Sequence, residues 1–336
     1  MLPRHVEELV THHRVGDASG FWVVTPANDD DLNYRGIRDG WLLDASVRYV
    51  VNRLSSSDTF VDVGANLGTF TIPAALKCQR VLAIEALPVN FVLLCRSLVK
   101  NRLTNVTPVH CAAHASAGVV NVAMESAWAT VSDTAPGVST PALSLDEMFS
   151  IHGVSDVAIL KIDIEGSELP ALRGMERALR ARAVREILLE VNETHCRAAG
   201  YTGDELLAYL AGHGYLLYQI YDGILSPFSP GAFRGLACCN FLASLHTLSG
   251  QHGELAVKEV ARETVLGYAM EYASSVHKEF RAHIAEEIRR APSWLLGHSD
   301  FMATVRKLEN DPEPTVRHAY ACGTAAGRAS GYFSNP

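Results

Sequence analysis

The stretch "TFVDVGANLGTFTIPAAL", Thr59 to Leu76, decides the fold of this chain. A short β-rich apolar run ends in an acid, a turn with two glycines follows, and an apolar segment with helical character comes next. In an open α/β sheet, ligands bind beyond the carboxyl ends of the strands, where glycines let the backbone approach them closely. The stretch therefore predicts a strand, turn and helix with a ligand site at the turn.

The turn lacks the glycine spacing of a dinucleotide site. That fingerprint would need three glycines, at the positions where this chain has Gly64, Asn66 and Thr69. A second acid, Glu85, closes the next predicted strand, and a carboxylate placed there can accept two hydrogen bonds from a ribose diol. Glu85 can equally cap the helix that follows Pro88, because acids are favourable at helix starts. The pattern favours a nucleoside ligand over a pyrophosphate-containing dinucleotide.

From Thr59 onward, β-rich runs alternate with segments of helical periodicity such as "NFVLLCRSLVKN" and "GDELLAYLAGHG". This alternation is typical of an α/β fold with a doubly wound, mostly parallel sheet. We therefore expect such a sheet, with an N-terminal lid segment before it and a helical extension after it. The predicted strands span residues 59–63, 81–85, 106–111, 157–163, 184–191, 215–221 and 237–243.

Changes in pattern divide the chain into four parts. We expect a lead or lid segment over residues 1–45, the sheet domain over 46–248, a helical extension over 249–322 and a loose tail over 323–336. The extension is predicted to form one or two amphipathic helices, whose apolar stripe would pack on the sheet domain or on a second subunit in a homodimer. The stripe consists of Leu266, Tyr268, Tyr272, Val276, Phe280, Ile284 and Ile288.

Composition excludes several classes of function. The net charge of −8 argues against a sequence-independent grip on nucleic acid phosphates. No apolar run approaches the roughly 20 residues needed to span a bilayer, and no secretory signal is visible at the N-terminus. The seven cysteines are scattered, which favours reduced thiols. We therefore expect a cytoplasmic protein with no transmembrane segment and no nucleic acid partner.

Three stretches together resemble one known family. They are "FVDVGANLGTFTIPAA", "AIEALPVNFVLLCRSLVKN" and "LKIDIEGSELPALRGM", and their order and spacing are similar to those of the FkbM-type methyltransferases, a branch of the class I enzymes. The resemblance covers roughly residues 40–243. It implies a seven-stranded Rossmann-like sheet, S-adenosylmethionine as methyl donor, and O-methylation of a hydroxyl on a sugar, a glycan or a glycosylated natural product.

The resemblance also implies which residues contact the donor. The two glycines of the turn would give backbone access, Asp62 and Asn66 would bind or orient the ammonium end, and Glu85 would hold the ribose. The stretch "HCAAH" would lie at the adenine, with contacts mainly through backbone. The full expected donor site is Asp62, Gly64, Asn66, Gly68, Glu85, Ala112 and Ala113.

Polar residues at two further strand ends are candidates for the chemistry, because methyl transfer needs an aligned acceptor oxygen and an outlet for its proton. "KIDIEGSE" supplies Asp163 and Glu165, and "REILLEVNETH" supplies Glu190, Asn192 and His195. In one mechanism, His195 or a carboxylate is the general base. In the other, Asp163 and Glu190, with Asn192 or Glu193, bind Mg²⁺, which prefers oxygen ligands.

Three rival functions remain open at this point. A nicotinamide-dependent oxidoreductase would use the same fold class, although the missing glycines count against it. A non-catalytic scaffold would bind the donor without turnover, and an N-methyltransferase would act on a different acceptor atom. Acceptor specificity is expected in the N-terminal loop, around residues 124–140 and in the C-terminal helices, and Tyr34 and Trp41 are candidates for a lid or a hydrophobic plug.

Overall fold

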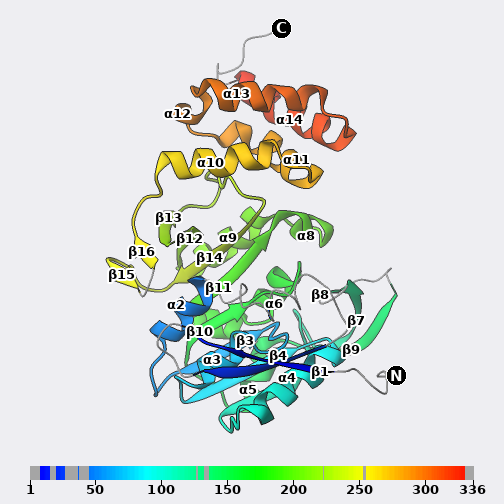
Figure 1. The fold of residues 1–336 in the computed structure, drawn as a ribbon, viewed down its shortest axis with the longest axis vertical. Coiled ribbons are helices and arrows are strands. Elements are labelled where there is room, and N and C mark those ends of the chain that lie inside the picture. Colours follow the sequence, from blue (N-terminus) through cyan, green and yellow to red (C-terminus); the bar gives the residue numbers. More distant parts are fainter. Residues whose placement is uncertain are drawn as a thin grey trace.

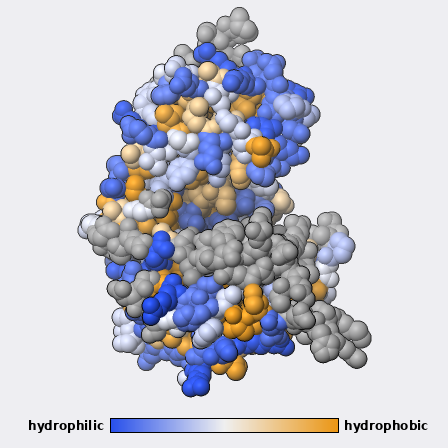
Figure 2. Space-filling model, in the orientation of Figure 1, coloured by the Kyte–Doolittle hydropathy of each residue, from blue (hydrophilic) through white to orange (hydrophobic). Residues whose placement is uncertain are grey.

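The computed structural model describes residues 8–15, 20–26, 37, 45–125, 128–131, 136–221, 223–252 and 255–329. Figure 1 shows a sheet domain with a helical extension stacked at one end, so that the C-terminus lies far from the strands. On the face seen in Figure 2, hydrophilic and hydrophobic residues are interspersed over both parts. Within the described ranges, no helix combines the length and the apolar character needed to cross a membrane.

The expected α/β class is confirmed, with the predicted strands at the centre of one large sheet. Neighbouring strands β5, β4, β3, β10 and β11 run parallel, whereas β14 lies between β11 and β12 and runs antiparallel to both. Their carboxyl ends therefore meet at one edge. The bounds are β3 Thr59–Val63, β4 Arg80–Glu85, β5 Val106–His110, β10 Val157–Ile162, β11 Val184–Asn192, β12 Leu216–Tyr221 and β14 Cys238–Ser244.

The sheet is longer than the seven strands expected. Beyond β12, strand β13 (Ile224–Phe228) pairs antiparallel, β16 (Leu255–Val257) pairs parallel with β13, and β15 (Gln251–His252) closes the edge, which makes ten strands among the described residues. These additions are two to five residues long. Strands of two or three residues, such as β15 and β16, carry too little period-two alternation to be detected from sequence.

Helices cover both faces of the sheet, and alternate strand residues enter two separate cores. In β3, for example, Phe60 lies in one core, whereas Val61 and Val63 lie in the other. Helix α5 begins at a capping box formed by Ser144 and Glu147. The helices are α2 Ala45–Arg53, α3 Thr71–Ala75, α4 Pro88–Lys100, α5 Leu145–His152, α6 Glu168–Arg173, α7 Glu176–Arg180, α8 Glu193–Ala198 and α9 Gly203–Gly212.

Two smaller sheets flank the main one. The N-terminal hairpin of β1 (Glu8–His13) and β2 (Phe21–Pro26) was not expected from the sequence; it packs on α4, where Val24 N donates to Ser97 Oγ at 3.0 Å. Much of the predicted lid, including Tyr34 and Trp41, lies outside the described residues. The second sheet contains β6 Ala112–Ala113, β7 Gly118–Glu125, β8 Trp128–Val131 and β9 Gly137–Leu143.

The helical extension has more elements than predicted and a core of its own. Ile284 and Ile288 are fully buried in that core, so the chain itself packs part of the stripe that was expected to face another subunit. Val276 is 88% exposed because it lies in the turn between α10 and α11. The helices are α10 Arg262–Ala273, α11 Lys278–Glu287, η1 Ile288–Arg290, α12 Ser293–Leu296, α13 Ser299–Arg306, η2 Lys307–Asn310 and α14 Pro314–Ala329.

Helix α14 also corrects the expected tail. The helix continues through residues 323–329, which were predicted to be loose, and residues 330–336 lie outside the described part. Its small residues allow close packing: a Cβ on Gly323 would lie 2.1 Å from the carbonyl oxygen of Ala285 in α11. A run of small residues can therefore mark a tight helix–helix contact as well as a flexible end.

Candidate active site

A cavity of about 260 Å³ opens at the carboxyl ends of β3, β4, β10 and β11. This is the edge at which open α/β sheets bind ligands. The structure brings most of the predicted site residues together in its wall. They are Gly64, Asn66, Glu85, Ala112, Ala113, Asp163, Glu165 and Glu190.

The glycine turn has a backbone that other residues could not follow easily. Gly64 has φ +80°, and a Cβ there would lie 2.0 Å from the carbonyl oxygen of Asp163. The N–H groups of Gly64 and Ala65 both donate to the Ile84 carbonyl at 2.9 Å, which ties the turn to β4. Gly68 has φ +97° and faces Ile72 and Leu94, so it serves helix packing rather than ligand access.

Glu85 satisfies both roles that the sequence left open. Its Oε1 accepts from Leu87 N at 2.7 Å, at the start of α4, and its Oε2 accepts from Asn66 N at 2.8 Å, in the turn. Each oxygen keeps a further lone pair, and the side chain lines the cavity. Burial raises the pKa of Glu85 to about 7. The carboxylate is thus fixed at the cavity wall, where it can accept hydroxyl groups.

Asp62 does not take the predicted place at the ligand. Its carboxylate is fully buried, accepts from Thr71 Oγ1 at 2.6 Å and lies 3.7 Å from Lys161 Nζ. Lys161 Nζ in turn donates to the Gly64 carbonyl at 2.9 Å and lies 3.4 Å from Asp163 Oδ2. Asp62 therefore stabilises the glycine turn indirectly, through its contact with Lys161.

Lys161 also lines the cavity. Burial lowers the pKa of Lys161, but the charges of Asp163 and Asp62 more than reverse this, so its pKa lies above the ordinary value. The ammonium group stays charged and offsets part of the negative charge around it. The available sequence signal was a lysine in an otherwise apolar strand, two residues before Asp163 and four before Glu165.

Three carboxylates in the cavity wall form an acidic cluster. One oxygen each of Asp163, Glu165 and Glu190 lies within 4.8 Å of the others. Burial and the charges of Asp163 and Glu165 raise the pKa of Glu190 to about 8, and burial raises the pKa of Glu165. Asn240 in β14 stands opposite Glu190 and lines the cavity; its polarity within the apolar run "CCNFLAS" was the signal that sequence reasoning missed.

The remaining two predicted residues stand behind this cluster. His195 Nδ1 lies 2.6 Å from Glu165 Oε2, and this contact raises the pKa of His195. Asn192 Oδ1 caps α8, accepting from Thr194 N at 3.1 Å and from His195 N at 3.4 Å. His195 thus orients Glu165, and the oxygen of Asn192 is already engaged. If a cation binds here, Glu165 replaces Asn192 in the expected ligand set.

This sheet order, with an antiparallel strand beside β11 and a glycine turn after β3, defines the class I methyltransferase fold. The chain carries an FkbM-family methyltransferase domain: residues 62–217 match the model described as "Methyltransferase FkbM domain". The matched residues span the glycine turn, Glu85, the acidic cluster and helix α8. This match supports methyltransferase activity of the FkbM type.

One curated protein and two solved structures illustrate what this chain is similar to. A curated protein, "31-O-demethyl-FK506 methyltransferase FkbM" of Streptomyces tacrolimicus, is 26% identical over 210 residues, which cover 52% of this chain and 78% of that protein. A solved FkbM methyltransferase from Methylobacillus flagellatus shares 20% identity with a TM-score of 0.38, over 64% of this chain and 55% of the other. TrmK of M. capricolum, solved with S-adenosylhomocysteine, shares 11% identity with a TM-score of 0.41, over 86% and 96% of the two chains.

Proposed function

We propose that the protein is an S-adenosylmethionine-dependent O-methyltransferase whose acceptor is a hydroxyl of a sugar, a glycan or a glycosylated natural product. The observation that carries the proposal is the single cavity that joins the glycine turn and Glu85 to the carboxylates of Asp163, Glu165 and Glu190. A donor site and a proton acceptor must share one space for in-line methyl transfer. The curated relative's name describes an O-methyltransferase, which agrees with this acceptor chemistry.

The residues present fit the donor. The left-handed backbone at Gly64 leaves room that a side chain would fill, and Glu85 offers two fixed oxygens to a ribose diol. The small side chains of Ala112 and Ala113 leave the wall flat where an adenine would lie. When bound, S-adenosylmethionine supplies an electrophilic methyl group on a sulfonium. Lys161 holds the glycine turn in place by donating to the Gly64 carbonyl.

Glu190 is the residue we assign as general base. It lines the cavity, and burial beside two other carboxylates makes it a stronger base than an exposed glutamate. It accepts the proton of the acceptor hydroxyl while the oxygen forms its bond to the methyl carbon and the carbon–sulfur bond breaks. His195 and Glu165 hold the cluster in place, and Asn240 can orient the acceptor oxygen from the opposite strand.

An acceptor screen tests this function. Purified protein is incubated with radiolabelled S-adenosylmethionine and a panel of free sugars, glycosides and glycosylated macrolides, and products are analysed by mass and NMR. We expect one methyl ether on a hydroxyl, with turnover that persists in EDTA. If turnover requires added Mg²⁺, the result would favour a mechanism in which a metal ion bound to the same carboxylates takes the place of the general base. A product methylated on nitrogen would favour an N-methyltransferase. Donor binding without turnover of any acceptor would favour a non-catalytic scaffold.

Donor binding should depend on pH through Glu85. Burial raises its pKa to about 7 in the free protein. The carboxylate is therefore largely ionised at pH 8 and largely protonated at pH 6. The ionised form accepts both ribose hydroxyls, so we expect S-adenosylhomocysteine to bind about tenfold more weakly at pH 6 than at pH 8. Calorimetry at both pH values checks this. Glu85→Gln should remove most of the dependence, and an equal dependence in this variant would refute the assignment.

A further inference from the structure

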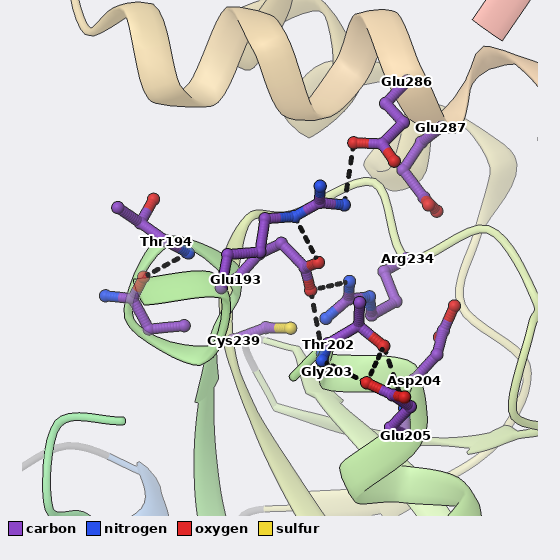
Figure 3. Close-up of polar contacts among 12 residues, drawn as sticks. Glu193, Thr194, Thr202, Gly203, Asp204, Glu205, Arg234, Cys239, Glu286 and Glu287 are labelled. Carbon is purple, nitrogen blue, oxygen red and sulfur yellow. Dashed lines mark hydrogen bonds and ion pairs between the residues drawn. The ribbon is translucent and has the colours of Figure 1, made fainter. Parts of the chain in front are cut away.

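The helical extension meets the sheet domain at a buried network of charged side chains (Figure 3). In the picture, Glu193 faces Arg234 and Gly203, with Glu286 and Glu287 on the far side of the network. The groups come from four places: helix α8, the start of α9, the loop before β14, and the end of α11 with η1. The members are Glu193, Arg197, Asp204, Arg234, Glu286, Glu287 and Arg290.

Glu193 is the centre of this network. Its Oε2 accepts from Arg234 Nη2 at 2.7 Å and from Gly203 N at 3.0 Å, and its Oε1 accepts from Arg197 Nε at 2.8 Å. Its own N–H donates to the Ala237 carbonyl at 2.8 Å. Glu193 is 5% exposed and Arg234 is 2% exposed, so this pair is shielded from water. Breaking a buried pair of this kind is strongly destabilising, because removal of one charge leaves the other buried without a partner.

Two arginines join the extension to the sheet domain, and the contact through Arg197 leads to Glu193. Arg197 connects α8 to α11, because its Nη2 lies 2.8 Å from Glu286 Oε2. Arg290 contacts Asp204 at the start of α9 and lies 3.0 Å from Glu287 Oε1. These are directional contacts in addition to apolar packing between the two parts. The position of α8 is therefore tied to α11, and the start of α9 is tied to η1.

The other side of α8 contacts the acidic cluster. Glu193 is its first residue, and His195, two residues later, lies 2.6 Å from Glu165. The helix backbone also presses on the loop that carries Glu165: a Cβ on Gly166 would lie 2.8 Å from the His195 carbonyl oxygen. Glu165 itself has φ +51°, in the left-handed region that favours glycine. This strained loop needs an outside support to hold its position.

We propose that Glu193 is a positioning residue, through which the C-terminal helical extension holds α8 and thereby sets the place of Glu165 in the cavity. The contacts run without a gap from Glu286 through Arg197 and Glu193 to His195 and Glu165. The role of Glu165 in the chemistry rests on the proposed function, whereas its placement by α8 does not. The extension is thus part of the active-site scaffold, as well as a candidate wall for the acceptor.

The test measures local order without any ligand. Arg234→Met and Glu286→Gln are compared with the wild-type full chain by amide hydrogen exchange and by NMR of ¹⁵N-labelled histidines, with the His195 signal assigned through its loss in His195→Gln. We expect exchange to quicken about tenfold or more over residues 193–198 and 163–168, with β3 and β4 unchanged. The ring nitrogen signals of His195 should shift, because its contact with Glu165 changes.

The matched control is Arg281→Met, which breaks the pair between Arg281 Nε and Asp311 Oδ2 (2.7 Å) within the extension. It should quicken exchange in α11 and α14 but leave His195 unshifted. Glu286 is 29% exposed, so Glu286→Gln should fold even if Arg234→Met does not. Unchanged exchange and His195 signals in the folded variants would overturn the proposal, as would a uniform rise across the sheet domain without a shift at His195. Failure of the wild type to bind S-adenosylhomocysteine would instead count against the proposed function.

Discussion

Gly64→Ala is expected to abolish donor binding and to destabilise the sheet domain. The new Cβ would lie 2.0 Å from the Asp163 carbonyl oxygen, so β3 and β10 must move apart at the cavity edge. The residue would also adopt φ +80°, which costs an alanine about 1 to 2 kcal/mol, and relief of the clash adds about 1 to 3 kcal/mol. Denaturant unfolding measures the loss of stability, and calorimetry with S-adenosylhomocysteine measures the loss of binding.

Gly153→Ala separates the two causes. Gly153 ends helix α5 at φ +62°, and an added Cβ would lie in open space among the described residues. This variant carries only the cost of the left-handed backbone, about 1 kcal/mol, and should bind donor normally. Equal effects of the two substitutions would show that the close approach of Gly64 to Asp163 is unimportant. Normal donor binding by Gly64→Ala would remove the turn from the site.

Glu190→Gln is expected to lower the turnover number by about 100- to 10,000-fold, the range that a positioned general base contributes. The amide keeps the shape of the side chain but cannot take a proton. Donor affinity should stay within about twofold, since we assign that binding to Glu85 and the turn. Single-turnover kinetics with the acceptor found in the screen provides the measurement.

Glu186→Gln is the matched control for that substitution. Glu186 lies on the same strand, is 3% exposed, and accepts from Tyr49 Oη at 2.8 Å and from Arg53 Nη2 at 2.8 Å. Its replacement should reduce stability by about 1 to 3 kcal/mol and leave turnover unchanged. If Glu190→Gln turns over normally, Glu190 is not the base. If both variants lose turnover equally, the effect arises from stability.

The central sheet and the donor side of the cavity could be predicted from sequence because both depend on local patterns. Strand runs, the glycine turn and the acid at the end of β4 are each readable within about twenty residues. Gly64 and Glu85 accordingly lie in the cavity wall. The burial of Asp62 could not be predicted, because sequence does not show which way the side chain of a strand-end acid points; here its carboxylate contacts Lys161 and Thr71.

Features that depend on contacts between distant segments could not be predicted. Asn240 meets Glu190 only because β14 inserts between β11 and β12, which adjacency in sequence does not reveal. Asn192 was assigned to a metal, but its oxygen is better placed to cap α8. The network around Glu193 joins segments that lie far apart in the sequence, because Arg197 contacts both Glu193 and Glu286. Each of these charges taken alone is indistinguishable from an ordinary surface charge.

Calorimetric titration tests most directly the central claim that the cavity binds S-adenosylmethionine through Glu85. Full-length protein is titrated in a calorimeter with S-adenosylhomocysteine and, separately, with NAD⁺, and each is repeated with Glu85→Ala. We predict saturable binding of S-adenosylhomocysteine, no binding of NAD⁺, and a loss of about 1 to 3 kcal/mol of binding free energy in the variant. Absence of S-adenosylhomocysteine binding by the folded wild-type protein, or equal binding by Glu85→Ala, would contradict the account.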